Sequence, residues 1–378
     1  MPEHNTWRDV IPSPALSDSQ NIATMAQSRH QLLKEHLSTP SKPLRPILTS
    51  LNGDNSWLMS FPRPAEEQTS TGKAYYHVVF EPWLKGPTSM YSSWMVHITL
   101  SSPPELSDAD AIEAVAREIE DAAVAHKPPP LQDGSVQGGR NGMVDAILLG
   151  FHFLDHLHEP TLRSFSGDIP VIAVPKAANI VRGLNHFKTI RTIQDLDSSA
   201  KSWRTPELHP GDPLPTWLTP IRLPGHHILN FCLATTWTHT VNGEEIHEAI
   251  FSSPHGTRLD EGPLNAFLNA EPKTEKLAML HGLKESHSAG SQTTLGAKGG
   301  LALFRKVGGV KHWIPTHSSK LWYSGIIMRL TWTNDTWRTL EWALEEEHKE
   351  SPDSRDARDL ERPNLHEVAN GESTVLTY

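Results

Sequence analysis

One short segment of the chain gathers side chains that bind divalent metals. The segment 151–159 contains one aspartate and three histidines, namely Asp155, His152, His156 and His158. Imidazole nitrogens and carboxylate oxygens are the usual protein ligands of zinc. The apolar run 146–150 precedes the segment and has the composition of a buried strand, and catalytic groups often lie on loops at strand ends. A metal site is one interpretation; a histidine-rich loop in a chain with 22 histidines is the other.

The order of these residues resembles a known signature. It is similar to the His-x-His-x-Asp-His motif of the metallo-β-lactamase superfamily, which also follows a strand. Asp155 and His156 match the final Asp-His pair. The first two histidines of the motif fall on Phe151 and Phe153, so both are missing from their places. The resemblance therefore comes with a degenerate motif.

Four more segments resemble blocks of the same family, in the family's order, over roughly residues 47–330. Segments 52–60 and 76–84 look like its first two sheet strands. His255 and His317 each end a strand-and-turn segment of the kind that delivers a metal-binding histidine. The resemblance implies an α/β fold, a four-layer αββα sandwich of two mixed β-sheets with helices outside.

The resemblance also implies how metal would be held. In the family, one ion is bound by the first two motif histidines and the third-block histidine. A second ion is bound by the Asp-His pair and the last histidine. Here the first set retains only His255, whereas the second retains Asp155, His156 and His317. Three protein ligands and an open position are typical of a catalytic zinc.

Two further histidines are alternative ligands. His281 stands where the family usually has an acid that bridges both ions, and an imidazole cannot bridge in that way. His158 lies two residues past His156 and could replace a lost ligand. Together these changes predict a mononuclear site. We expect one zinc ion, with another divalent metal or no metal as the alternatives.

Metal-dependent hydrolysis is the expected function. A metal-activated water would attack an ester, lactone, amide, thioester or phosphoester, and Asp155 would be the catalytic proton acceptor. The alternative is a pseudoenzyme that serves as a binding or scaffold protein, with Phe151 and Phe153 filling the space of the lost ligands. The sequence contains neither a phosphate-binding Walker loop nor the Gly-x-Ser-x-Gly elbow of many serine hydrolases.

Composition limits the partners. The net charge is −10 and no basic block of five residues occurs, so we expect a small-molecule substrate and no nucleic acid. Cys232, the only cysteine, lies in an apolar run and is expected in the core. No apolar leader and no run of 18 apolar residues occurs. We therefore expect a cytoplasmic protein without a membrane partner; the oligomeric state stays open.

Three parts are expected along the chain. Residues 1–45 are a polar, proline-rich and loosely packed lead-in, residues 46–345 form the metallo-β-lactamase-like domain, and residues 346–378 form a polar, disordered tail. Within the domain, the spacing of apolar residues predicts a helix over 107–126. Clustered prolines and glycines predict a surface insertion over 203–227, and the composition of 332–346 is helical.

Overall fold

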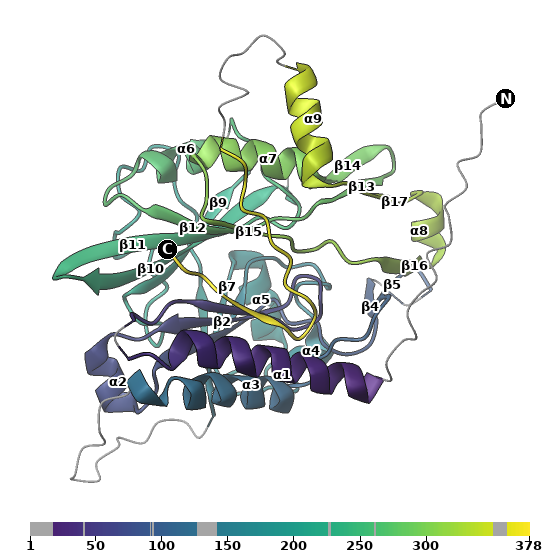
Figure 1. Cartoon of the computed structure of the whole chain (residues 1–378). Coiled ribbons are helices and arrows are strands. Elements are labelled where there is room, and N and C mark those ends of the chain that lie inside the picture. The colour runs from purple at the N-terminus through teal and green to yellow at the C-terminus, as the bar shows by residue number, and fades with distance from the viewer. Residues whose placement is uncertain are drawn as a thin grey trace.

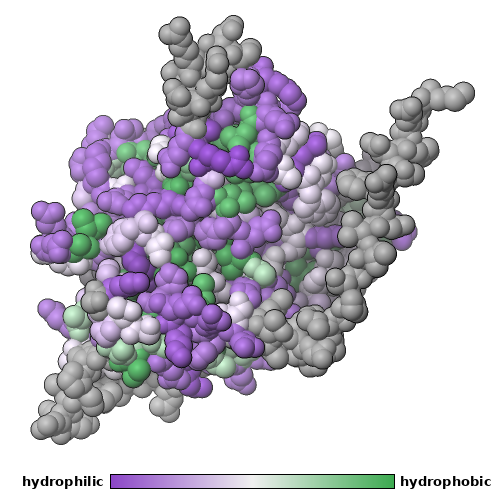
Figure 2. Space-filling model, viewed as in Figure 1, coloured by the Kyte–Doolittle hydropathy of each residue, from purple (hydrophilic) through white to green (hydrophobic). Residues whose placement is uncertain are grey.

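The computed structural model describes residues 18–378, apart from 41, 91, 93, 127–141, 226–227, 261 and 351–360. Two large β-sheets lie at the centre of the molecule, and helices cover their outer sides (Figure 1). This is the αββα sandwich that the sequence predicts. The surface visible in Figure 2 is mostly hydrophilic, as expected for a chain of net charge −10.

The first sheet has seven strands and is mixed. Strands β18, β1, β2 and β3 pair antiparallel, and β3, β6, β7 and β8 pair parallel. In sheet order the strands are β18 (Ser373–Val375), β1 (Ile47–Ser50), β2 (Trp57–Pro62), β3 (Tyr75–Phe80), β6 (Val144–Leu149), β7 (Val171–Ala173) and β8 (Ile190–Thr192).

The second sheet has five strands and is also mixed. Strands β9, β10 and β11 pair antiparallel, and β11, β12 and β15 pair parallel. In sheet order they are β15 (His312–Ile314), β12 (Glu275–Leu280), β11 (Glu244–Ser252), β10 (Phe231–Val241) and β9 (Leu218–Pro224). Because each sheet contains parallel strands, their carboxyl ends can deliver side chains to one common edge.

Two small sheets accompany the sandwich. One contains β14 (Ser291–Leu295), β13 (Lys284–Ser288) and β17 (Asn334–Trp337). The other contains β16 (Leu321–Ser324), β5 (Val96–Leu100) and β4 (Thr88–Met90). The second of these lies with helix α8 (Ile326–Leu330) at one side of the molecule (Figure 1).

The helices form the outer layers. Helices α1 and α3 contact each other on the side of the first sheet, and α6 and α7 lie on the side of the second (Figure 1). The remaining helices join strands or extend the surface. Besides α8, the helices of the described residues are α1 (Asp18–Leu37), α2 (Ala65–Thr71), α3 (Ala109–Ala122), η1 (Val124–His126), α4 (Glu159–Leu162), α5 (Pro175–Gly183), α6 (Gly262–Asn269), α7 (Gly296–Val307) and α9 (Leu340–Glu350).

Alternation along the strands builds two cores. In β10, Leu233 and Trp237 belong to the core between the sheets, whereas Cys232 and Ala234 face the layer of α6 and α7. Successive side chains on a strand point to opposite faces, which accounts for this division. Cys232 is fully buried, as predicted, and burial raises the pKa of its thiol.

Both ends of the described chain are packed more tightly than the sequence suggests. Leu33 and Leu37 of α1 are buried in the core, so this part of the expected loose lead-in is ordered. Strand β18 pairs with β1, and Leu376 is fully buried. The prediction of a disordered tail is therefore wrong for residues 361–378. Residues 1–17 and 351–360 of these two expected segments lie outside the described residues.

Inside the domain, two predictions need correction and one is confirmed. Segment 203–227 contains strand β9 and the buried Trp203, so it is more than a surface insertion. Segment 332–346 begins with strand β17 before helix α9 starts. The helix over 107–126 is present as α3 and η1, and the Asp108 side chain accepts a hydrogen bond from the Ala111 amide at its start.

None of the helices in the described part of the chain is long and apolar enough to cross a bilayer.

Candidate metal centre

Three histidines converge at one edge of the sandwich. His156, His255 and His317 each offer one nitrogen, and these three nitrogens lie within 4.8 Å of one another. The ring centroids are 5.3 Å apart for His156 and His255, 5.2 Å for His156 and His317, and 4.7 Å for His255 and His317. All three side chains are buried. The sequence separates them by up to 161 residues, and the fold brings them together.

Strand ends position the three rings. His156 follows β6 of the first sheet, while His255 follows β11 and His317 follows β15 of the second. The backbone at two of these turns has positive φ: His317 itself at 50° and Gly256, directly after His255, at 86°. A non-glycine residue in this conformation costs free energy and is concentrated at functional sites. The chain therefore holds His317 in a strained turn at the cluster.

Each ring is oriented through its Nδ1 atom. Glu81 Oε2 lies 2.6 Å from Nδ1 of His156, and Asp54 Oδ2 lies 3.1 Å from Nδ1 of His317. The hydroxyl of Thr294 lies 3.2 Å from Nδ1 of His255. Histidines that bind metal through Nε2 usually have their other nitrogen held by a carboxylate or similar acceptor, which fixes ring and tautomer.

One pair of the remaining nitrogens has the spacing that an ion requires. Nε2 of His156 and Nε2 of His255 are 3.3 Å apart. Two nitrogens bound tetrahedrally to one zinc ion at ~2.0–2.1 Å would be about 3.3–3.4 Å apart. The donor set, its burial and its Nδ1 partners therefore fit one divalent ion.

Electrostatics distinguish two of the ligand candidates, His156 and His255. Burial disfavours a charged ring at His156, but the carboxylates of Glu81 and Asp155 outweigh it and raise the pKa of His156 to about 9. Burial and the nearby rings of His317 and His156 lower the pKa of His255 well below its usual value. His255 is thus neutral at physiological pH and has a lone pair to donate.

Asp54 and Lys284 support the histidine cluster from outside. Burial alone would raise the pKa of Asp54, but His317 and Lys284 outweigh it and hold that pKa well below its usual range. The ammonium of Lys284 is buried and donates to the carbonyl of Ser319 at 3.1 Å. Ser319 in turn donates its amide to Asp54. The loop that carries His317 is therefore tied to the loop that carries Asp54.

The two phenylalanines of the degenerate motif differ. Phe151 is buried, and its ring centroid lies 5.1 Å from that of His156 and 5.6 Å from that of His255. It also packs on Phe153 and Phe231. Phe153 is only partly buried against the core. Phe151 therefore forms an apolar wall directly beside the histidine cluster.

Asp155 lies next to the cluster but outside the group of three. Its Oδ2 is 3.6 Å from Nε2 of His156, and its side chain is 16% exposed whereas that of His156 is fully buried. Asp155 is thus on the more open side of the site. Its expected roles as metal ligand and catalytic residue remain predictions.

The other candidate histidines lie elsewhere. Both ring nitrogens of His158 have other partners, the Thr161 hydroxyl at 2.8 Å and the Pro87 carbonyl at 3.3 Å. Nδ1 of His281 donates to the carbonyl of Gly282, and burial lowers the pKa of His281 to about 4. Neither belongs to the three-histidine group.

His152 also stays apart from the three rings. It lines a separate cavity of about 310 Å³ together with Lys176 and Arg222. Within the described residues, His152 is not a member of the cluster.

Sequence reasoning missed several supporting residues. Asp54 and Thr294 orient two of the rings, and Lys284 braces the loops. Asp54 lies in the segment 52–60 that resembles the family's first strand, so its polar turn was a visible signal. Nothing in the sequence marks Thr294 or Lys284.

Comparison with protein-family models and with curated proteins gives no match. Two mixed sheets packed face to face, helices outside them and histidines at the strand ends of one edge are what the sequence resemblance implied. This architecture resembles the metallo-β-lactamase fold.

Solved structures of similar outline include three bacterial proteins. An isothiocyanate hydrolase from Delia radicum gut bacteria is 14% identical, with a TM-score of 0.46 over 87% of this chain and 98% of the other. A possible metal-dependent hydrolase from Veillonella parvula is 10% identical, with a TM-score of 0.47 over 88% and 100%. The metallo-β-lactamase fold protein YhfI from Bacillus subtilis is 9% identical, with a TM-score of 0.39 over 87% and 99%. Similarity at this level leaves the reaction open.

Proposed function

We propose that this protein is a metal-dependent hydrolase with one divalent ion held by His156, His255 and His317. The observation that supports this most is the convergence of three buried ring nitrogens, each ring oriented from behind by Glu81, Thr294 or Asp54. Zinc is the proposed ion, because three imidazoles and an open fourth position suit it. The proposed ligand set differs from the one expected from sequence in that His255 takes the place of Asp155.

The residues around the site have separate tasks in this proposal. A bound divalent ion supplies Lewis acidity, which polarises a carbonyl or phosphoryl oxygen and lowers the pKa of water. Asp155, partly exposed beside His156, accepts the proton of the attacking water. Phe151 excludes water from one side of the histidines. The substrates in question are an ester, lactone, amide, thioester or phosphoester.

One observation favours a non-catalytic alternative. Phe151 fills the space beside His156 and His255, and the Nε2 atoms of these two histidines are close enough for a direct hydrogen bond at 3.3 Å. A histidine pair of this kind, with a proton shared between the rings, needs no ion. In that case the fold would serve as a binding or scaffold protein.

Metal content and turnover together test the proposal. The untagged protein should contain close to one equivalent of a divalent metal after dialysis, and it should hydrolyse at least one chromogenic ester, lactone or phosphodiester. His317→Ala should lose both the metal and the activity, since it removes one of three ligands. Asp155→Ala should lose activity and keep most of its metal. His152→Ala is the matched control in the same loop and should change neither.

Two outcomes would contradict the proposal. A wild-type protein that is stable, metal-free and inactive would favour the binding or scaffold role. Two tightly held equivalents of metal would show that a second set of ligands exists and that the site is not mononuclear.

A further inference from the structure

Large apolar side chains are exposed together on one small part of the molecule. Five of them are more than half exposed, and we call this set the tryptophan layer: Trp94 (64%), Trp322 (57%), Ile326 (53%), Leu330 (75%) and Trp332 (85%). Single exposed apolar residues are normal, but a contiguous group usually marks a site of interaction.

Backbone contacts hold these residues near one another. Strand β16, which carries Trp322, pairs with β5, and helix α8, which carries Ile326 and Leu330, contacts both strands. The amide of Ile326 donates to the carbonyl of Trp94 at 3.0 Å. Trp332 follows α8 by two residues. Figure 1 shows β5, β16 and α8 together at the edge of the molecule, beside the sandwich rather than within it.

Trp332 has an unfavourable backbone conformation as well as an exposed ring. Its φ is 44°, a value that bulky side chains rarely adopt. With 85% of the residue exposed, burial within this chain gives little compensation for that strain. Burial of the Trp332 ring in the surface of a partner would compensate for the strain.

The charge around the tryptophan layer differs from that of the chain as a whole. Segments 88–100 and 320–338 together contain three basic residues, Lys320, Arg329 and Arg338, and one acidic residue, Asp335. The acidic side chain is largely buried beside Lys284. Lys320 and Arg329 are exposed, and the Lys320 ammonium lies 4.6 Å from the Trp322 ring. A locally basic apolar surface thus stands on a chain of net charge −10.

We propose that the tryptophan layer docks on the surface of an anionic lipid bilayer. Tryptophan is favoured at the boundary between lipid headgroups and hydrocarbon, because its ring is apolar and its N–H is polar. Exposed Lys320 and Arg329 would contact the anionic headgroups, which attract basic side chains near a membrane surface. The expectation of no membrane partner rested on the lack of a spanning segment, and that lack has no bearing on peripheral binding.

Charge also argues against a second copy of this chain as the occupant. A twofold symmetric contact places the same surface on both partners. Pairing of two tryptophan layers would therefore bring Lys320 and Arg329 towards the same two cations of the other copy. An anionic bilayer has the opposite charge, so it complements the basic residues and the aromatic rings together.

Vesicle sedimentation tests the proposal with the full-length wild-type protein. Binding should be clear with phosphatidylcholine vesicles that contain phosphatidylserine, weaker with phosphatidylcholine alone, and weaker again at high salt. Trp322→Ser combined with Trp332→Ser should weaken binding by roughly tenfold or more, because two large apolar side chains no longer leave water. Lys320→Gln combined with Arg329→Gln should remove the preference for phosphatidylserine.

The matched control replaces two exposed apolar residues elsewhere. Val124→Ser combined with Ile180→Ser should bind vesicles as the wild type does. Wild-type protein that binds neither kind of vesicle would overturn the proposal. So would light scattering that shows a wild-type dimer which the double tryptophan variant converts to a monomer, since the layer would then be a contact between copies. Equal binding to both kinds of vesicle would overturn the anionic part.

Discussion

The carboxylate of Glu81 lies 2.6 Å from Nδ1 of His156, and both side chains are buried. Glu81 directly follows strand β3 and has a positive φ of 46°. The side-chain amide of Asn55 also donates to the same carboxylate oxygen. A strained backbone and a buried charge are both costly unless something compensates. The contact with His156 provides that compensation and leaves Nε2 of the ring facing Nε2 of His255.

Glu81→Gln should therefore weaken metal binding more than it weakens the fold. The amide keeps the shape of the side chain. It lacks the negative charge that orients the His156 ring and makes that ring a more basic metal ligand. Loss of such an outer partner typically costs about 10–100-fold in metal affinity. Competition with a chromogenic chelator measures this change. Glu159→Gln is the control, since Glu159 lies in the same segment as His156 and pairs with exposed Arg163. Equal metal affinity in the two variants would show that Glu81 has no role at the site.

Phe151→Ala should destabilise the protein strongly, by about 3–5 kcal/mol, the usual range for a large buried aromatic. The ring is buried and packs on Phe153, Phe231 and three histidines. Phe153→Ala should cost clearly less, because Phe153 is only partly buried. Urea unfolding of the two variants gives the comparison. A smaller loss for Phe151→Ala than for Phe153→Ala would show that the ring beside the histidines is not part of the core.

An ion pair outside the cluster of His156, His255 and His317 predicts how stability depends on pH. Arg45 binds Glu248 with two hydrogen bonds, at 2.7 and 2.9 Å, and both side chains are buried. Burial alone would raise the pKa of Glu248, but hydrogen bonds from His239 and Arg45 outweigh it and lower it to about 2. The ionised Glu248 carboxylate therefore stabilises the folded protein. Because its pKa is lowered on folding, this stabilisation is complete above the unfolded pKa of about 4.3 and is lost as the pH falls towards 2.

Glu248→Gln should accordingly cost roughly 3–5 kcal/mol near neutral pH, because Arg45 is left buried without its counter-charge. The difference from wild type should shrink as the pH falls below about 4.3, where the wild-type carboxylate also begins to lose its advantage. Urea unfolding at several pH values measures it. Glu159→Gln again serves as the exposed control and should change stability by about 0.5 kcal/mol or less. A difference that does not depend on pH would mean that packing, not charge, holds Glu248.

Sequence alone could predict the layers and that His156 and His317 would lie together. His156 and His317 were expected to share an ion because each ends a segment that resembles a family block. The strands of the sandwich could be predicted for the same reason and from their apolar alternation. His255 was expected at the site but in a different ligand set, since the order of residues along a chain does not state how closely two strand ends approach.

The parts that sequence could not predict depend on contacts between distant segments. Strand β18 contains only three residues in a polar stretch, and it is a strand because β1 offers it an open edge. Lys284 reads as an ordinary surface lysine, yet it is 1% exposed because the carbonyl of Ser319 and the carboxylate of Asp335 surround its ammonium. Contacts with distant segments determine the strand at β18 and the burial of Lys284, and the local sequence gives no information about those contacts.

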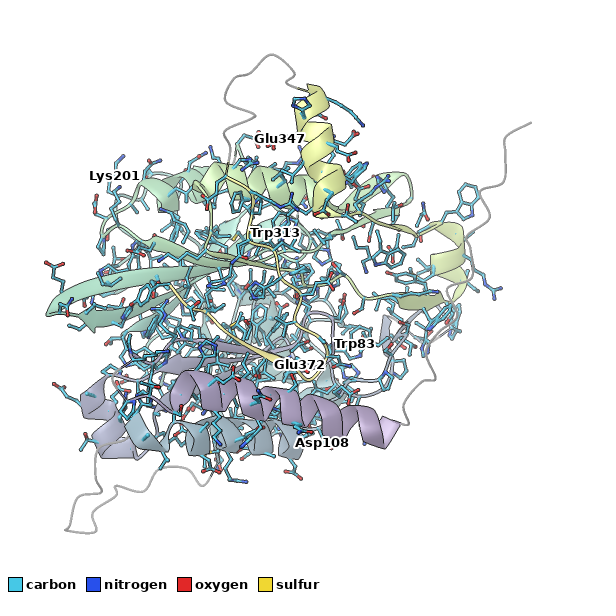
Figure 3. The ribbon with its side chains drawn as sticks, in the orientation of Figure 1. Trp83, Asp108, Lys201, Trp313, Glu347 and Glu372 are labelled. Atoms are coloured by element: carbon cyan, nitrogen blue, oxygen red, sulfur yellow. The ribbon has the colours of Figure 1, made fainter. Side chains whose placement is uncertain are left out.

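The contact between helix α7 and Trp313 gives the last prediction. Gly300 of α7 lies against the indole of Trp313, which is labelled in Figure 3, so a methyl group added at this glycine would meet the ring at 2.3 Å. Nδ1 of His281 would lie 2.8 Å from the same methyl. Trp313 is fully buried and donates its indole N–H to the carbonyl of His281, so it cannot withdraw without breaking that bond.

Gly300→Ala should therefore destabilise the fold by about 1–3 kcal/mol through overpacking, although alanine is the better helix former. Gly183→Ala is the matched control, because Gly183 ends helix α5 and has no atom within 4 Å of the added methyl. That change should be neutral or stabilise by up to about 1 kcal/mol. Thermal and urea unfolding compare the two. Equal stability of both variants would mean that α7 can shift away from Trp313, and that the helix is not fixed against the sheet behind the histidines.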